Sequence, residues 1–361
     1  MRGDGTLAQV QVALVADDLT GALDAVAPFA EAGLRCVVAT EPGSLKDAMA
    51  SGAAVVAVST NSREMREADA VAAVRSVAEM LVSVPRVVKK VDSRLKGHVA
   101  QETMALAAVL GLRKALVCPA IPAMGRVVRN GNVDGFGVDA PIPVVARIEN
   151  NAGLSVMSPD AGSDTDIDRI VETTADDVLL VGARGLSSAL ARRMARPDHR
   201  PRTLLLLPLP TAIGIGSRDP ITLAQVEDVR RVRGDAVYAT APDGICPDAV
   251  AEAGLLIVQT TKGPGDAKPA DVTAAFAEGF VKLAAKGRAS LILTGGETAS
   301  AVLSLMGIRL LEVLGEPISG LPLCRALDFP GAPIILTKSG GFGAPDVFSR
   351  LLPPPTATKR H

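Results

Sequence analysis

Short runs of valine, alanine, isoleucine and leucine alternate with longer segments of helical periodicity along most of this chain. Residues 10–16, 34–39 and 53–59 are apolar almost throughout rather than at every second position, which indicates strands covered on both faces. Residues 19–32 and 64–82 repeat apolar side chains at helical spacing. Strands that alternate with helices are joined by crossovers and run parallel. The sequence therefore predicts an α/β fold.

The same alternation continues through the rest of the sequence. Further strands are expected at residues 86–91, 114–118, 177–181, 203–207, 211–215, 255–259, 290–293 and 332–336. Further helices are expected at residues 99–110, 221–232, 270–286 and 297–305, with a final helix that ends at Leu352. Residues 119–140 and 158–166 show no clear period and are expected to be loops.

The length of the chain predicts two domains, because 361 residues exceed what one hydrophobic core usually serves. The segment Pro208-Leu209-Pro210 is the expected boundary, which gives domains 1–207 and 208–361. Each domain is expected to be a lobe with a mostly parallel sheet covered by helices. Ligands usually bind where lobes meet, so the active site is expected in the inter-lobe cleft.

Composition argues against several classes of function. Lysine and arginine total 38 against 39 aspartates and glutamates, and the chain has no tryptophan and one tyrosine. This balance predicts no nucleic-acid partner and no anionic membrane partner. The sequence has no apolar run of membrane-spanning length and no signal-peptide pattern at its start. Four widely spaced cysteines and three histidines offer little for a disulfide framework or a zinc site. We expect a cytoplasmic protein.

Charged residues gather where three expected strands end, which is where parallel sheets meet their ligands. Asp17 and Asp18 follow the first strand, and either could cap the next helix or face a ligand. Arg63 follows the third strand and could pair with a substrate carboxylate or form a surface ion pair. The fourth strand carries Lys90 at its end, followed by a dense charged segment up to His98. Two lysines within an apolar strand favour a functional role over a merely solvated loop.

Glycine-rich bends follow three expected strands of the second domain. They contain Ser217, the run from Gly295 through Gly296 and Glu297 to Thr298, and the run Lys338-Ser-Gly340-Gly341-Phe-Gly343. Backbone amides in such bends, together with helix N-termini, can hold phosphates. The Walker A spacing is absent, and each bend alone could be an ordinary tight turn. Three of them in one domain favour a nucleotide site.

These motifs together resemble the four-carbon acid sugar kinase family, which includes D-threonate, D-erythronate and 3-oxo-tetronate kinases. The resemblance spans nearly the whole chain. Its motifs, in order, are Ala16-Asp-Asp-Leu-Thr-Gly21, Lys90-Val-Asp-Ser93 with Gly97, Pro119-Ala-Ile-Pro122 with Gly125-Arg126, Gly216-Ser217 with Gln225, Gly295-Gly-Glu-Thr298 and Lys338-Ser-Gly-Gly-Phe-Gly343.

The resemblance implies an N-terminal domain that binds the acid sugar and a C-terminal domain that binds ATP, with transfer of the γ-phosphoryl group to the 4-hydroxyl. The substrate residues it implies are Asp17, Asp18, Arg63, Lys90, Asp92 and Ser93. The ATP residues it implies are Ser217, Gly295, Gly296, Glu297, Thr298, Gly340 and Gly341. No metal ligand is assigned, and a homodimer is left open.

Three departures from the family separate this chain from many relatives. It is shorter, it reads Asp92-Ser-Arg94-Leu-Lys-Gly-His98 where many read Asp-Ser-Thr-Leu-Arg-Gly-Asn, and it has Gly341 where asparagine is common. Arg94 and His98 could reshape the carboxylate pocket, so the preferred stereoisomer stays open.

The expected mechanism needs positioning and charge stabilisation. Arg63 and Lys90 are predicted to hold the substrate carboxylate, and Asp18 or Asp92 to orient the hydroxyl and accept its proton. Lys338 or the amides beside it would stabilise phosphate charge, with Mg²⁺ bridging the β- and γ-oxygens.

Two other functions compete with that of a kinase. A dehydrogenase is disfavoured, because no Gly-x-Gly-x-x-Gly turn follows the first strand. The alternative is a non-catalytic protein that binds a nucleotide or an acid sugar, as a sensor or effector.

Overall fold

The computed structural model describes residues 9–148, 153–197, 199, 206–284 and 287–355. The chain divides into two compact units, Met1–Pro201 and Arg202–His361. The boundary expected at residue 208 lies shortly after this division. The strand expected at residues 203–207 falls mainly outside the described residues, and Leu207 donates its amide to the Leu351 carbonyl at 2.8 Å.

The first unit contains a wholly parallel sheet with the order β2-β3-β1-β4-β10-β5-β9. Its strands are β1 (Val12–Ala16), β2 (Cys36–Ala39), β3 (Val55–Ser59), β4 (Arg86–Lys90), β5 (Lys114–Cys118), β9 (Ser155–Met157) and β10 (Val178–Gly182). Every residue of β1 and β3 is buried. This burial confirms the prediction from the continuous apolar runs that the sheet is covered on both faces.

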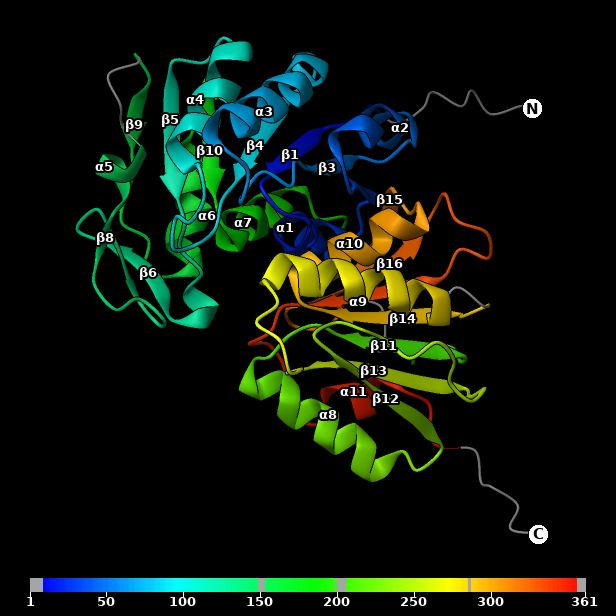
Figure 1. Cartoon of the computed structure of the whole chain (residues 1–361). Coiled ribbons are helices and arrows are strands. Elements are labelled where there is room, and N and C mark those ends of the chain that lie inside the picture. The colour runs from blue at the N-terminus through cyan, green and yellow to red at the C-terminus, as the bar shows by residue number, and fades with distance from the viewer. Residues whose placement is uncertain (1–8, 149–152, 198, 200–205, 285–286, 356–361) are drawn as a thin grey trace, which may run out of the picture. The chain divides into compact units, whose positions relative to one another are not determined.

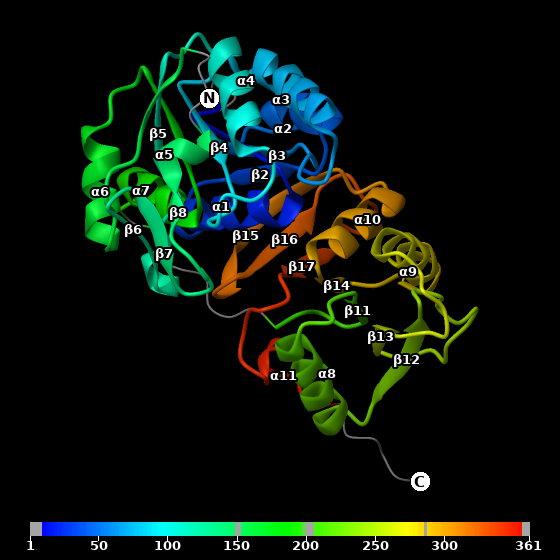
Figure 2. The same cartoon turned by 60° about the vertical axis from the view of Figure 1, so that its left-hand side comes forward.

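Helices cover both faces of this sheet (Figures 1 and 2). They are α1 (Leu19–Glu31), α2 (Leu45–Ala50), α3 (Glu67–Leu81), α4 (Val99–Val109), α5 (Val144–Ile148), α6 (Asp164–Thr173) and α7 (Arg184–Met194). Helix α7 packs against α1 and α6 on one face, and α3 packs against α4 on the other. Residues 158–163 form a loop as expected, but α6 already begins at Asp164, because Ser163 and Asp166 form a capping box that starts the helix.

The segment 119–140, which was expected to be a loop, is instead partly ordered as strands. It contains a 3₁₀ turn (Pro122–Met124), β6 (Arg126–Arg129) and β7 (Asn132–Gly135), which form a small antiparallel sheet with β8 (Ile142–Pro143). Asn130 and Gly131 both have positive φ in the turn between β6 and β7. An Asn-Gly turn of this kind is a strong hairpin signal.

The second unit contains a mixed sheet with the order β12-β13-β11-β14-β17-β16-β15. Its strands are β11 (Thr211–Ile215), β12 (Ala236–Pro242), β13 (Leu255–Thr261), β14 (Ser290–Thr294), β15 (Leu310–Ile318), β16 (Leu321–Ala326) and β17 (Ile334–Lys338). The first four and β17 pair in parallel, whereas β15, β16 and β17 pair antiparallel in succession. The antiparallel hairpin was not expected from the sequence.

Helices cover both faces of this second sheet (Figure 1). Helices α9 (Pro269–Ala284) and α10 (Gly296–Met306) pack together on one face, and α8 (Pro220–Val232) packs with α11 (Val347–Leu351) on the other. Phe348 and Leu351 of α11 join Val226 and Val229 of α8 in a buried core. This core fixes the N-terminal end of α8 beside the loop that follows β17.

Candidate active site

Each sheet has a point where the chain changes direction, and ligands of open α/β sheets bind at the carboxyl ends of the strands there. In the first unit this point is β1, because the chain passes from β1 to β2 on one side and from β3 to β4 across it. In the second unit it is β11, which lies between β13 and β14. The residues predicted for the two ligands follow these strands and their neighbours.

Asp17, Asp18 and Arg63 form one ion-pair network at the end of β1. Arg63 Nε and Nη2 each donate to a different Asp17 carboxylate oxygen at 2.8 Å, and Arg63 Nη1 donates to Asp18 Oδ2 at 2.7 Å. Asp18 also caps α1, because its Oδ1 accepts from the Gly21 amide at 2.8 Å. Three of the five N–H groups of Arg63 therefore end on aspartates. A direct bond from Arg63 to a substrate carboxylate stays a prediction that this geometry does not favour.

The buried Asp17 carboxylate is held in its charged form by cations on both sides. Burial alone would raise the pKa of Asp17, but Lys89, the Arg63 hydrogen bonds and Lys90 outweigh it and lower that pKa. An aspartate that is 3% exposed and bonded through both oxygens is a poor acceptor for a substrate proton. Asp17 is better suited to orienting Arg63.

Behind this network lies a buried ion pair between Lys89, one of the two lysines of the apolar strand, and Glu102, for which no role was predicted. Lys89 Nζ lies 2.8 Å from Glu102 Oε2, and both side chains are 1% exposed. Glu102 Oε1 accepts from Ser62 Oγ at 2.6 Å, and Ser62 donates its amide to the Asp17 carbonyl. Glu102 of α4 thus holds the loop that carries Arg63.

Lys90, Asp92 and Ser93 occupy the loop after β4, and they are bound less tightly than Asp17. Lys90 is 5% exposed, and its Nζ donates to the Val91 carbonyl at 3.1 Å. Asp92 Oδ1 accepts from the Arg94 amide at 2.8 Å. Within the described part of the chain, Lys90 forms no ion pair and the second Asp92 oxygen accepts no hydrogen bond. Both groups are therefore available to a ligand.

The same loop has an unusual backbone conformation. Leu95 has φ of +55° and its side chain is fully buried. A non-glycine residue in this region is strained, and such strain gathers at ligand sites. The His98 ring contacts the backbone after Arg63, because its Nε2 lies 2.7 Å from the Met65 carbonyl oxygen.

Arg126, at the start of β6, also belongs to this site, although no role was predicted for it from the sequence. Its Nη1 bonds to Ser93 Oγ, and its Nε and Nη2 donate to the Phe136 carbonyl at 3.1 and 2.7 Å. The Gly125-Arg126 motif is the sequence signal for this residue, although the surrounding segment lacks a clear period. The hairpin carries this arginine to the end of β4.

In the second unit, the three glycine bends follow the neighbouring strands β11, β14 and β17 and lie together. A Cβ built on Gly216 would lie 1.9 Å from Thr298 Oγ1, and one on Gly340 would lie 2.7 Å from Ser217 Oγ. Gly295 has φ of +91° and donates its amide to the Lys338 carbonyl at 3.0 Å. Glycine is thus required for close approach at the first two positions and for backbone conformation at the third. Such a cradle fits a nucleotide's phosphates.

Not every residue predicted for ATP lies in these close contacts. Gly341 is open, since a Cβ built there would meet only Asp219 Oδ2, at 3.7 Å. Gly296 is the first residue of α10, and Glu297 is exposed in its first turn. Glu297 could reach a hydrated magnesium ion, but its role stays a prediction.

Lys338 is buried beneath the third bend rather than exposed in it. Its Nζ donates to Thr222 Oγ1 at 2.9 Å and to the carbonyls of Ser339 and Gly340 at 3.2 and 2.7 Å. Burial lowers the pKa of Lys338 to about 8, against an opposing effect of Asp219. These bonds use all three ammonium protons, so the geometry favours a role in holding the bend. Contact with phosphate stays a prediction.

The Gln225 side chain of α8 also holds the bend that follows β17. Its amide nitrogen donates to the carbonyls of Phe342, Gly343 and Ala344 at 2.9 to 3.1 Å. The two N–H groups of this fully buried side chain are shared among the three carbonyls, and they fix the course of the loop after β17.

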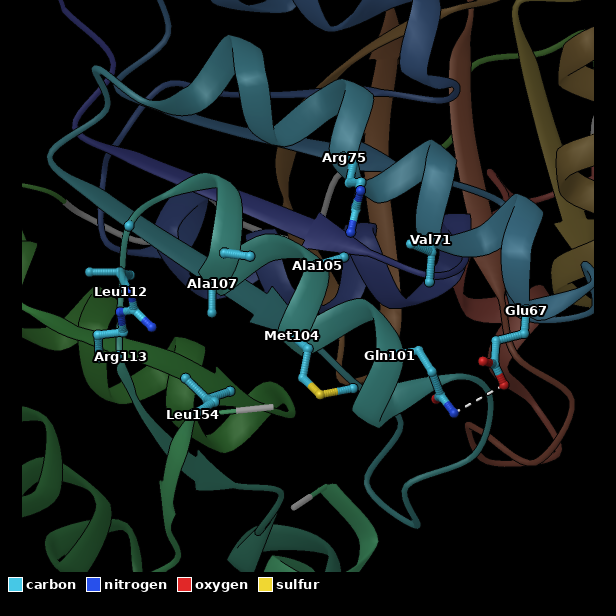
Figure 3. Close-up of a pocket in the computed structure, with 13 residues that line it drawn as sticks. Glu67, Val71, Arg75, Gln101, Met104, Ala105, Ala107, Leu112, Arg113 and Leu154 are labelled. Atoms are coloured by element: carbon cyan, nitrogen blue, oxygen red, sulfur yellow. Dashed lines mark hydrogen bonds between the residues drawn. The ribbon is translucent and has the colours of Figure 1, made fainter. Parts of the chain in front are cut away.

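A separate groove of about 520 Å³ lies between α3 and α4 (Figure 3). Val71, Met104 and Leu154 give it an apolar lining, and Gln101 bonds with Glu67 at its rim at 3.1 Å. None of the predicted site residues lines this groove, so it does not belong to the candidate active site.

Two further observations concern only the described residues. They contain no group of three or more histidine, cysteine, aspartate or glutamate side chains placed to hold a metal ion. None of their helices is long and apolar enough to cross a membrane.

Comparison with known proteins agrees with the two-domain division. The sugar-binding N-terminal domain family matches residues 12–141, and the nucleotide-binding C-terminal domain family matches residues 212–348. A D-threonate kinase of Bordetella bronchiseptica is 29% identical over 94% of this chain and 96% of its own length. A 3-oxo-tetronate kinase of Methylobacterium radiotolerans is 27% identical over 94% of this chain and 97% of its own length.

Solved structures support the fold. A crystal structure titled as a putative tRNA synthase of Salmonella typhimurium has a TM-score of 0.75 at 20% identity, covering 94% of this chain and 98% of its own. A Haemophilus influenzae protein has a TM-score of 0.72 at 21% identity with the same coverage. With both domain families matched in order over most of the sequence, the chain belongs to the four-carbon acid sugar kinase family.

Proposed function

We propose that this protein is an ATP-dependent kinase that phosphorylates the terminal 4-hydroxyl of a four-carbon acid sugar such as D-threonate, D-erythronate or 3-oxo-tetronate. The observation that carries this proposal is the charge at the end of β4. Lys90, Arg94 and Arg126 form no ion pair within the described residues, and Asp92 is the carboxylate whose charge acts on Arg126. Such a surplus of cations suits a substrate that is itself an anion and receives a phosphoryl group.

The nucleotide is assigned to the cradle formed by Gly216, Gly295 and Gly340. Bound ATP supplies the phosphoryl group, and Mg²⁺ held mainly by its phosphates and by water would neutralise the charge between the β- and γ-oxygens. The N-terminus of α10 presents amides beside Gly295. Transfer also requires a closed state that excludes water, so an active site in a cleft between the domains remains part of the proposal.

Of the two aspartates predicted to act as the base, Asp92 is favoured. Asp18 already caps α1 and pairs with Arg63, whereas one oxygen of Asp92 has no hydrogen bond in the described structure. Asp92 accepts the proton of the substrate 4-hydroxyl as that oxygen bonds to the γ-phosphorus and the bond to ADP breaks. Lys90, beside it, stabilises the negative charge that is transferred.

The test is an ADP-release assay with the three acid sugars, followed by identification of the phosphorylated product. We expect acid-dependent ADP release and a 4-phosphate product. Asp92→Asn should lower kcat by roughly 100-fold or more with little change in KM. Asp69→Asn, an exposed aspartate on α3, serves as the matched control and should keep normal turnover.

Two outcomes would refute the proposal in different ways. Ligand-induced thermal stabilisation without ADP release from any acid sugar would favour the non-catalytic binding protein instead. If Asp92→Asn and Asp18→Asn both kept near-normal turnover, the kinase would stand but the assignment of the base would be wrong.

A further inference from the structure

The side chain of Arg126 is a buried cation for which the described structure provides no counter-ion. It is 7% exposed, yet its bonds go only to neutral acceptors, the Phe136 carbonyl and the Ser93 hydroxyl. Buried charges in proteins are normally paired, because removing a charge from water costs several kcal/mol. A buried guanidinium left with neutral partners indicates that an anion completes the site when it is bound.

The backbone around Arg126 holds the side chain in this position. A Cβ on Gly135 would lie 2.1 Å from the Gly125 carbonyl oxygen, so the β6–β7 hairpin closes tightly at the residue before Arg126. A Cβ on Gly137 would lie 3.0 Å from Arg126 Nη2. Hydrogen bonds to the Phe136 carbonyl and to Ser93 Oγ hold the guanidinium, and its remaining Nη1 and Nη2 protons can bond to the two oxygens of a carboxylate.

The neighbours of Arg126 increase the positive charge. Arg94 Nη1 approaches the Gly137 carbonyl at 3.4 Å, on the same loop that Arg126 contacts. Burial lowers the pKa of Arg126, and the like charge of Arg94 lowers it further, while Asp92 acts in the opposite direction. Two arginines that repel each other beside a single carboxylate favour a second anion.

Arg63, which was expected to bind the substrate carboxylate, does not offer the same opportunity. Its charge is already matched by Asp17 and Asp18 through three hydrogen bonds. An incoming carboxylate would have to displace one of these aspartates. At Arg126 it would meet a cation with no such competitor.

We propose that Arg126, with Arg94 beside it, binds the carboxylate of the acid sugar and makes the enzyme select acids over neutral polyols. The Ser93 hydroxyl accepts from Arg126, so its own proton is free to donate to the same carboxylate. This inference rests on the proposed function and deepens it by naming the residue that recognises the acid group. Asp92, next to Ser93, then lies where the hydroxyl-bearing part of the substrate begins.

The test compares D-erythronate with erythritol, its neutral counterpart in which a hydroxymethyl group replaces the carboxylate. Binding of each is measured by calorimetry, and phosphorylation by ADP release. In Arg126→Gln, we expect D-erythronate binding to weaken by roughly 10- to 100-fold, because a charged hydrogen bond is lost. Erythritol binding and the KM for ATP should not change, so the preference for the acid should collapse.

Two further variants separate recognition from folding. Arg126→Lys keeps the charge without the fork and should lose less affinity than Arg126→Gln. Arg129→Gln removes an exposed arginine of the same strand, paired with Asp134, and should change neither ligand. Without ligand, the melting temperature of Arg126→Gln should equal or exceed that of the wild type, because an unpaired buried charge is removed.

The inference is overturned if Arg126→Gln still prefers D-erythronate over erythritol as strongly as the wild type. It is also overturned if Arg126→Gln and Arg126→Lys unfold at lower temperature but bind the acid normally once folded. Failure of the proposed function would look different: the wild type itself would release no ADP, while calorimetry would still report whether Arg126 is needed to bind the acid.

Discussion

The buried pair of Lys89 and Glu102 allows the cost of an uncompensated charge to be measured directly. Both side chains are 1% exposed, and their charged atoms are 2.8 Å apart. In Glu102→Gln the shape of the side chain is kept and the Ser62 hydrogen bond can still form, but Lys89 loses its counter-ion. Breaking a buried pair in this way costs about 3–5 kcal/mol of the free energy of unfolding. For a unit of 201 residues, this corresponds to a melting temperature lower by about 6–20 °C.

Equilibrium urea unfolding, followed by circular dichroism with each transition fitted separately, measures this cost. The double variant Lys89→Met/Glu102→Gln removes both charges of this pair, and Asp17, which loses the attraction of Lys89, keeps its bonds to Arg63. It should therefore be at least about 2 kcal/mol more stable than Glu102→Gln alone. The control is Asp177→Asn, which breaks the exposed pair with Lys114, where the side chains are 63% and 51% exposed. It should cost no more than about 1 kcal/mol.

The reasoning is refuted if Glu102→Gln lies within about 1 kcal/mol of the wild type, a cost typical of an exposed pair. It is equally refuted if neutralising Lys89 gives no recovery in the double variant. Either result would mean that water or structural relaxation compensates the Lys89 charge, and the same conclusion would then weaken the argument about Arg126.

Three other results are expected. Folding lowers the pKa of Asp17, so its ion pair stabilises the protein fully above the ordinary pKa of 3.8 and less as the pH falls below that value. The difference in free energy of unfolding between the wild type and Asp17→Asn, measured in urea, should therefore shrink as the pH falls through this range. Gly295→Ala should raise the KM for ATP by roughly tenfold or more, because alanine is strained at φ of +91°. The control Gly307→Ala, at the other end of α10, should cost only about 1 kcal/mol of stability and leave the KM for ATP unchanged. Because the pKa of Lys338 falls from 10.5 to about 8 on folding, the unfolded chain binds more protons between these values, and the wild type should gain stability relative to Lys338→Met as the pH rises through this window.

The fold was predictable where the governing pattern is local. Continuous apolar runs indicate buried parallel strands, and strand β11 has the predicted bounds, Thr211–Ile215. The cap of α1 by Asp18 depends on a residue three positions away, and it was among the roles considered for that aspartate. The antiparallel hairpin β15–β16 was not predicted, because its residues show no strict alternation, although Ser319-Gly320 between the two strands is a turn dipeptide and Gly320 has φ of +81°. The β6–β7 hairpin has a stronger signal in Asn130-Gly131, but this signal lies among other glycines and prolines that give the segment no clear period.

The candidate site was predictable in position but not in its pairing of charges. The sequence located Asp17, Arg63, Lys90 and Asp92 at the ends of strands, and the structure gathers them at the ends of β1, β3 and β4. It could not show which cations were already neutralised. Lys89 and Lys90 are neighbours in the sequence, yet only Lys89 has a carboxylate partner within the described structure.

This difference has a physical reason that also explains why the proposed carboxylate site moves from Arg63 to Arg126. A strand end or a helix cap is determined by residues within a few positions, whereas an ion pair depends on contacts that the fold alone creates. Arg63 meets Asp17 across 46 positions, and Arg126 meets Ser93 across 33. A cation can bind an anionic ligand readily only when the folded protein provides it with no carboxylate partner. In this protein the arginine expected to be free is matched by two aspartates, and the one in the supposed loop is buried with neutral partners only.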